Sequence, residues 1–128
     1  MSILKVSSRL QLNNRTLQGI RDASGRAMEE TAKSLHDEVV KAQVMPYKSG
    51  ALQNSSTYLD TADSASGRVA IVSNTPYARR LYFHPEYHFS KAGNASARGR
   101  WYKRWLPGGS QKDFARREFI KFYQKEAP

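Results

Sequence analysis

The chain has 128 residues, which is the length of a single domain, and 39% of them are hydrophobic, enough for one core. It contains no cysteine, which excludes a disulfide framework and a thiolate metal site. No apolar stretch approaches the ~20 residues of a membrane span, and residues 2–12 are too polar for a signal peptide. We therefore expect one domain, residues 1–128, that is made in the cytoplasm and contacts no membrane.

The positive charge is concentrated in the C-terminal part of the chain. Residues 79–128 hold twelve Lys or Arg and four Asp or Glu, whereas residues 1–78 hold nine and seven, and the net charge of the chain is +10. A one-sided positive field attracts polyanions or the acidic faces of proteins. The alternative is a solvated surface that only keeps the protein soluble.

The N-terminal residues alternate between apolar and polar side chains. Residues 1–12 place Leu4, Val6, Leu10 and Leu12 on one side, which predicts a half-buried strand. Residues 15–44 then carry apolar or small side chains at steps of three or four, which predicts one long helix lying across a sheet. Each glycine inside this helix costs about 1 kcal/mol relative to alanine, so a break near Gly25 is an alternative.

The middle of the chain predicts an antiparallel hairpin. Residues 45–50 form a loop, because Pro46 stops the helix and Gly50 permits a positive φ. Residues 54–61 and 68–74 alternate as strands do, and the polar segment between them is rich in turn residues.

The stretch VSNTPYARRLYF, residues 72–83, ends the second strand and begins a short helix. Thr75 suits the N-cap and Pro76 the first helical position, so we expect a helix over residues 76–83. Its apolar side chains point in several directions, and a helix this short is not stable alone. It must therefore be covered from more than one side.

The C-terminal third begins with an extended loop, residues 85–100, which lacks any apolar period and which we expect to be exposed. Residues 100–106 fit either a helical turn or a strand. Ser110 and Asp113 resemble a capping box ahead of a C-terminal helix. The predicted fold class is α+β: a small antiparallel sheet with one long N-terminal helix packed across it, a short helix and a C-terminal helix.

The sequence does not favour catalysis. His84, Glu86 and His88 alternate as metal ligands on a strand can, but Pro85 lies between them and no second-shell partner is evident. No serine lies in a nucleophile elbow, and no two carboxylates share an apolar setting. We predict a protein that is not an enzyme and that has no catalytic residue, no metal site and no cofactor.

A basic patch with interleaved aromatic residues lies between residues 91 and 104. This composition suits a surface that stacks bases and binds phosphates without reading sequence. One interpretation is therefore a small basic protein that binds nucleic acid nonspecifically, with affinity that falls steeply with salt. The patch consists of Lys91, Arg98, Arg100, Lys103 and Arg104.

A protein interface is the competing interpretation, because Trp, Tyr and Arg are the residue types most enriched at binding hot spots. Acidic side chains of the long helix, such as Glu29 and Glu30, are complementary to them within copies of the same chain, which favours self-assembly. A third alternative is that Trp101 and Trp105 only pack in the core.

The order of these segments resembles the small neck and tail-completion proteins of long-tailed bacteriophages, including those called minor capsid proteins. The family has a Thr/Ser-Gly-x-Leu-x-x-Ser stretch after its helix, which residues 49–55 match as SGALQNS. It also has a strand followed by Pro-Tyr-Ala and an aromatic turn, matched by Pro76-Tyr77-Ala78 and Leu81-Tyr82, and a tryptophan after the variable loop, matched by Trp101. The strong C-terminal basicity and the second tryptophan depart from the family pattern.

The resemblance implies a noncatalytic part of the virion that forms a ring, a hexamer or a dodecamer, at the head–tail junction. Other connector and tail proteins would be its neighbours, and genomic DNA would pass through the ring without sequence-specific contact. On this interpretation Tyr77 and Leu81 face the core of the domain. The predicted subunit interface consists of Arg79, Arg80, Tyr82, Trp101, Trp105, Glu29 and Glu30.

Overall fold

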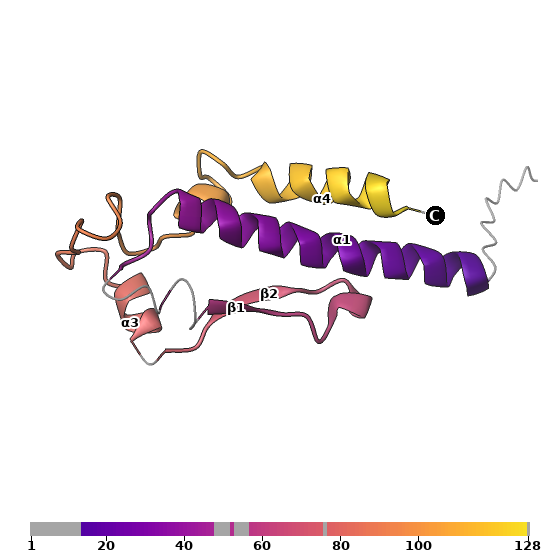
Figure 1. Ribbon diagram of the computed structural model, residues 1–128, viewed down its shortest axis with the longest axis horizontal. Coiled ribbons are helices and arrows are strands. Elements are labelled where there is room, and N and C mark those ends of the chain that lie inside the picture. Colours follow the sequence, from indigo (N-terminus) through magenta and orange to yellow (C-terminus); the bar gives the residue numbers. More distant parts are fainter. Residues whose placement is uncertain (1–13, 48–51, 53–56, 76, 128) are drawn as a thin grey trace, which may run out of the picture.

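The computed structural model describes residues 14–47, 52, 57–75 and 77–127, and it has the predicted α+β architecture (Figure 1). A long helix, α1 (Asn14–Lys41), lies between a β-hairpin on one side and the C-terminal helix α4 (Phe114–Glu126) on the other. The strand predicted over residues 1–12 lies outside the described residues. None of the described helices is both long enough and apolar enough to cross a membrane.

The hairpin consists of β1 (Thr57–Asp60) and β2 (Ala70–Ser73), which pair antiparallel with Thr57 opposite Ser73. A single 3-10 turn, η1 (Ser64–Ser66), forms its tip. Gly67 follows this turn with φ of 82°, a left-handed conformation that favours glycine. In the described part of the chain the sheet has only these two strands.

Small residues allow the hairpin tip to lie close against α1, which continues through Gly25 without a break. Ala23 and Ala27, two positions before and after Gly25, lie on the other side of α1 and are also fully buried. A Cβ added at Gly25 would lie 3.1 Å from the carbonyl oxygen of Ser64 in η1. The glycine therefore permits a close contact between helix and hairpin, and the energetic cost of glycine in a helix does not break α1.

Helix α4 packs against the other side of α1 through apolar and polar contacts. The Arg26 Nε donates to Glu126 Oε2 over 2.7 Å, and the Ser34 hydroxyl donates to Glu118 Oε2 over 3.3 Å. The predicted capping box is wrong. The observed N-cap is Asp113, three residues after the expected cap Ser110, and it makes no side-chain capping bond.

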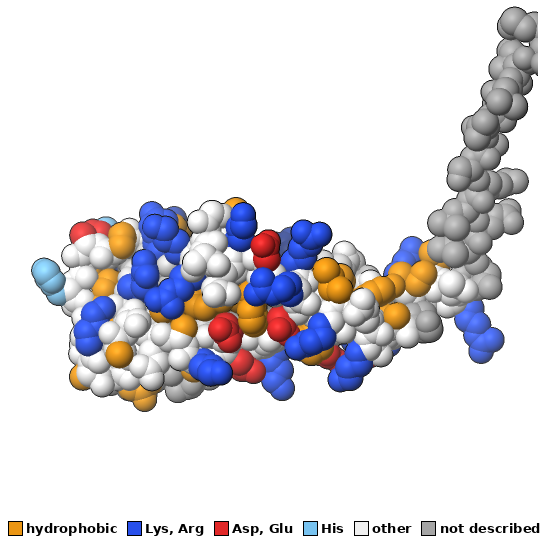
Figure 2. Space-filling model, turned by 90° about the horizontal axis from the view of Figure 1, so that it is seen from above, with side chains coloured by type: hydrophobic (Ala, Val, Ile, Leu, Met, Phe, Trp, Pro, Cys, Tyr) orange, Lys and Arg blue, Asp and Glu red, His pale blue; other side chains and the backbone are white. Residues whose placement is uncertain are grey.

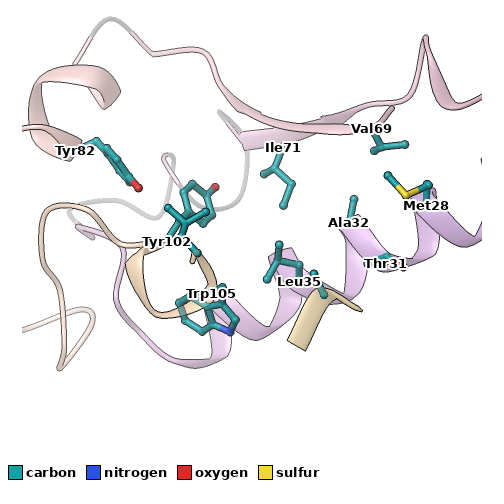
Figure 3. Close-up of a pocket in the computed structure, with 11 residues that line it drawn as sticks. Met28, Thr31, Ala32, Leu35, Val69, Ile71, Tyr82, Tyr102 and Trp105 are labelled. Atoms are coloured by element: carbon teal, nitrogen blue, oxygen red, sulfur yellow. The ribbon is translucent and has the colours of Figure 1, made fainter. Parts of the chain in front are cut away.

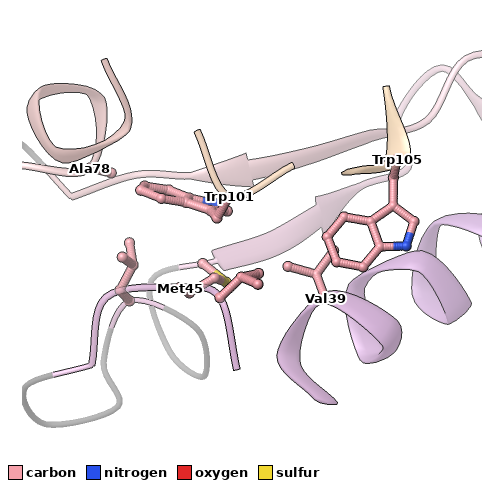
Figure 4. Packing of buried hydrophobic residues seen from close by; sticks show 7 residues of the cluster. Val39, Met45, Ala78, Trp101 and Trp105 are labelled. Carbon is pink, nitrogen blue, oxygen red and sulfur yellow. The ribbon is translucent and has the colours of Figure 1, made fainter. Parts of the chain in front are cut away.

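The largest cluster of buried side chains lies at the C-terminal end of α1. Figure 4 shows Trp101 between Ala78 and Met45, and Trp105 beside Val39. Val44 and Leu52 complete the buried cluster. Trp105 belongs to a 3-10 turn, η2 (Lys103–Trp105), so the helical alternative for residues 100–106 is confirmed.

The predicted loop at residues 85–100 has neither helix nor strand, as expected, but it is not simply exposed. The Asn94 Nδ2 donates to the carbonyl oxygen of Met45 over 2.8 Å, and the Arg98 N–H donates to that of Val44 over 2.9 Å. Asn94 and Ala97 are buried. The loop is therefore fixed to the segment that follows α1 by the chain's own hydrogen bonds.

Candidate functional site

The short helix α3 (Ala78–Tyr82) presents two arginines to solvent. It begins two residues later than predicted, and Thr75 does not act as a side-chain cap. Ala78 is the buried residue of this helix, so Arg79 and Arg80 point outward on the next positions. Their exposure is what an interface on this helix requires.

The buried face of α3 is rotated relative to the prediction. Tyr77 was expected in the core but is 45% exposed. Tyr82 was expected at an interface, but it is half-buried and packs edge to face on Trp101 with ring centroids 4.8 Å apart. Leu81 packs partly against the core, as predicted. The positions of Ala78 and Tyr82, four residues apart, show which face of α3 meets the core.

The burial of Trp101 and Trp105 disagrees with their predicted place at a subunit interface. They are 2% and 6% exposed, and both belong to the core cluster of their own chain. A side chain buried in this way offers no surface to a neighbour. The structure therefore supports the core-packing alternative for both tryptophans.

The acidic pair Glu29 and Glu30 is half-buried rather than freely exposed. Arg26 contacts the carboxyl group of Glu126 at the end of α4, and the Glu30 side chain is near enough to contribute to the lowered pKa of Glu126. The hydrogen bond from Arg26 is the main reason why the pKa of Glu126 is lowered. Part of the predicted acidic surface is thus engaged by α4 of the same chain.

The exposed residues that remain around α3 form what we call the arginine–aromatic surface: Arg79, Arg80, Phe83, His84 and Arg100. The first four line an open hollow of about 550 Å³. Phe83 is 53% exposed, and the Arg100 guanidinium lies 5.4 Å from its ring centroid. A cation over an exposed ring is stabilised by about 0.5–1 kcal/mol, so this contact helps to orient the guanidinium.

Backbone geometry brings Arg100 to this surface. A Cβ at Gly99 would lie 2.8 Å from the Cα of Pro85, so only glycine lets the loop pass so close to the end of α3. Arg100 then has φ of 47°, and its N–H donates to the carbonyl oxygen of Tyr82 over 2.9 Å. Residues far apart in sequence are in this way fixed beside each other.

Two hydrogen bonds order the rim of the surface. The Arg80 Nε donates to the Tyr87 hydroxyl over 3.3 Å, and this bond raises the pKa of Arg80. His84 Nδ1 lies 2.7 Å from Glu86 Oε1, and this bond is the main cause of the lowered pKa of Glu86. The His84 ring also stacks on Tyr87 with centroids 4.7 Å apart.

The predicted basic patch is divided between several surroundings. Arg98 and Lys103 are exposed, whereas Arg104 is half-buried. The Lys91 ammonium donates to the carbonyl oxygen of Ala97, which ties it to its own loop. Figure 2 shows Lys and Arg side chains over much of the visible face, with hydrophobic side chains between them. Residues 77–106 hold seven Lys or Arg and one acid, so the charge of this segment is positive and attracts anions rather than cations.

The surface has residue types that are common in binding sites. Arginine and aromatic side chains recognise carboxylates, phosphates and flat apolar groups. In the described part of the chain, no group of three His, Cys, Asp or Glu side chains is arranged to hold a metal ion. His84, Glu86 and His88 therefore do not form the cluster that their spacing allowed.

The sequence did not indicate Phe83 and His84 as members of the surface, nor Tyr87 at its rim. Gly99 was the available signal, since a glycine in a loop often marks a close backbone approach.

Comparisons of the chain with known protein families, with curated proteins and with solved structures give no match. The resemblance to neck and tail-completion proteins therefore remains a prediction.

Proposed function

We propose that the chain is a noncatalytic structural subunit of a phage virion, which forms a ring at the head–tail junction. The arginine–aromatic surface supports this proposal most directly. It is ordered by the chain's own contacts, yet Phe83 and the two arginines of α3 stay exposed. Such residues are enriched at hot spots between proteins.

A ring needs one surface on each subunit that meets a different surface of the next subunit. The arginine–aromatic surface is positive, so its counterpart on the neighbour is acidic. Exposed Asp37 and half-buried Glu38 lie on α1 of each copy and offer such a counterpart. Of the acidic side chains expected on this side of α1, which also include Glu29 and Glu30, Asp37 and Glu38 are then the main partners, because Glu30 lies near Glu126 of α4.

The test is a double charge reversal, Arg79→Glu with Arg80→Glu, in a phage whose own copy of the gene is deleted. We expect heads and tails that do not join, seen by electron microscopy, because the reversed surface repels its acidic counterpart. The matched control is Arg116→Glu with Arg117→Glu, an adjacent pair exposed on α4 that gives the same net charge.

The control should restore joined particles, and circular dichroism should show that both variants fold. Normal joining by the α3 variant would contradict the proposal. Sedimentation of the pure protein is not the test of this proposal, because a subunit of such a ring can stay monomeric until it binds the neighbouring connector or tail proteins.

A second candidate is nonspecific binding to nucleic acid, which the excess of cations at residues 77–106 favours. Because both tryptophans are buried, bases would have to stack on other rings of this segment, such as Tyr77, Phe83 and Tyr87. Binding of single-stranded DNA measured across salt distinguishes the two functions. Tight, salt-steep affinity of a monomer that Arg98→Glu with Arg100→Glu abolishes would favour nucleic acid.

A further inference from the structure

The outer face of α4 carries a row of cations. Arg117, Lys121 and Lys125 lie four residues apart and are all exposed, so they form one line along the helix. Arg116 is exposed beside the start of this line. Figure 2 looks onto the side of the molecule that carries α4, where Lys and Arg side chains are more frequent than Asp and Glu. We call Arg116, Arg117, Lys121 and Lys125 the α4 cationic face.

The packing of α4 does not depend on these cations. The helix contacts α1 through a half-buried stripe whose members recur at steps of three or four. The two acidic residues of the helix, Glu118 and Glu126, belong to this stripe and bond to Ser34 and Arg26 of α1. The acids are therefore turned inward, and the outer face keeps the cations. The stripe consists of Phe114, Ala115, Glu118, Phe119, Phe122, Tyr123 and Glu126.

The cations lie at positions that disfavour the helix. Arg116 and Arg117 are in the first turn of α4, which holds no acidic residue, and the helix dipole disfavours cations there. Like charges four residues apart, such as Arg117 and Lys121, also repel each other. Within the described residues, one ion pair offsets this repulsion, between Lys121 and Glu118 over 2.8 Å. Side chains that work against their own helix are typical of functional sites.

The chemistry of the face suits a polyanion with evenly spaced charges. The line from Arg117 to Lys125 is about 12 Å long. Phosphates of one strand of duplex DNA are spaced by about 3.4 Å along its axis, so the line spans several of them. Lysine is depleted at protein interfaces, and on this face Ile120 is the exposed large apolar residue. Insertion into a lipid surface needs a free apolar stripe, but that of α4 packs on α1.

We propose that the α4 cationic face binds the phosphate backbone of nucleic acid without reading its sequence. Arg116 and Arg117 suit bidentate contacts with phosphate oxygens, and Lys121 and Lys125 add point charges along the same backbone. This proposal does not rest on the function proposed above. Joining of head and tail is assigned there to α3, so loss of the α4 face should lower the affinity for nucleic acid and leave joining intact.

The test variant is Arg117→Gln with Lys125→Gln in the full chain, which removes both ends of the line. Binding of a short labelled DNA duplex is measured by fluorescence anisotropy over a series of salt concentrations. Each phosphate contact contributes about 0.9 to the slope of log affinity against log salt concentration, so the slope should become shallower by about 2. At low salt the affinity should fall at least several-fold, and equally for duplexes of unrelated sequence.

The hairpin side of α1 supplies the matched control. Figure 1 shows α4 and the hairpin on opposite sides of α1, and Figure 3 shows Val69 and Ile71 of β2 on the side that faces α1. Arg68 precedes β2, and Arg21 lines a hollow between α1 and the hairpin tip. Both arginines are exposed. Arg21→Gln with Arg68→Gln removes the same charge from the other side of the molecule and should change the salt slope little.

Four results would overturn the proposal. The first is a chain that binds no duplex, and the second is an equal loss in the α4 variant and the control, since binding would then follow net charge alone. The third is abolition by Arg98→Glu with Arg100→Glu while the α4 variant binds normally, which would assign binding to residues 77–106. The fourth is binding to phosphatidylserine vesicles without binding to DNA, which would make a lipid surface the partner.

A second measurement separates binding from folding. The urea midpoint of the Arg117→Gln with Lys125→Gln variant should stay the same or rise, because the substitutions relieve repulsion along the helix. A midpoint that falls along with the affinity would show that these side chains support the fold, and it would contradict their assignment to a binding face.

Discussion

The two ends of α1 are held by different kinds of contact. At the C-terminal end, large side chains such as Val39, Met45 and Trp101 pack into one buried cluster. Toward the N-terminal end, Gly25 meets the hairpin tip, and an ion pair with α4 takes the place of a large apolar contact. The difference indicates that the aromatic end supplies most of the stability, whereas the hairpin end depends on close approach and charge.

The largest expected effect is at the aromatic end. Trp101→Ala should lower the free energy of unfolding by about 3–5 kcal/mol, because it leaves a cavity in the core. Urea denaturation followed by circular dichroism measures the change. Phe83→Ala is the matched control, and its exposed ring should cost far less. Similar losses for the two variants would contradict the division between core and surface.

A smaller effect is expected where α1 meets the hairpin tip. Alanine stabilises a helix by about 1 kcal/mol relative to glycine, so Gly19→Ala should raise the free energy of unfolding by that amount. Gly25→Ala should gain less or lose stability, because its Cβ would lie 3.1 Å from the backbone oxygen of Ser64. Thermal denaturation of both variants is the measurement. An equal gain at the two positions would show that the tip can move away.

The smallest effect is expected for the ion pair between Arg26 and Glu126, whose side chains are 53% and 21% exposed. The pKa of Glu126 is lowered in the folded chain, so its contribution is present above the ordinary glutamate pKa of about 4.3. The contribution is lost as the pH falls through the lowered pKa.

Glu126→Gln should therefore reduce the urea midpoint slightly at pH 7 and not at all in strong acid. Added salt should shrink the difference at neutral pH. Asp37→Asn, an exposed change on α1, is the control. A difference that grows toward acid pH would reverse the assigned sign.

The sequence predicted α1, the hairpin and α4 because each has a clear period of apolar residues. It did not predict the rotation of α3, since five residues contain too little period to distinguish the face of Ala78 from that of Tyr77. It also assigned the tryptophans to an interface. Composition alone does not separate a core aromatic from an interface aromatic, because both sites favour the same residue types.

The arginine–aromatic surface was predicted only in part, through Arg79 and Arg80. Its other members adjoin or belong to the loop at residues 85–100. This loop is held against the segment that follows α1 by the hydrogen bond from Asn94 to Met45. These two residues are 49 positions apart, so no local sequence pattern predicts their contact.

Both indoles lie in one buried cluster, so the tryptophan fluorescence of the chain follows the unfolding of that cluster. These are its two tryptophans, so fluorescence excited selectively at tryptophan reports solvent entry at the aromatic end. Far-ultraviolet circular dichroism is dominated by the 28 residues of α1, which extend well beyond that cluster. Recording both signals in a single titration shows whether the molecule melts as one cooperative unit or frays first from the hairpin side.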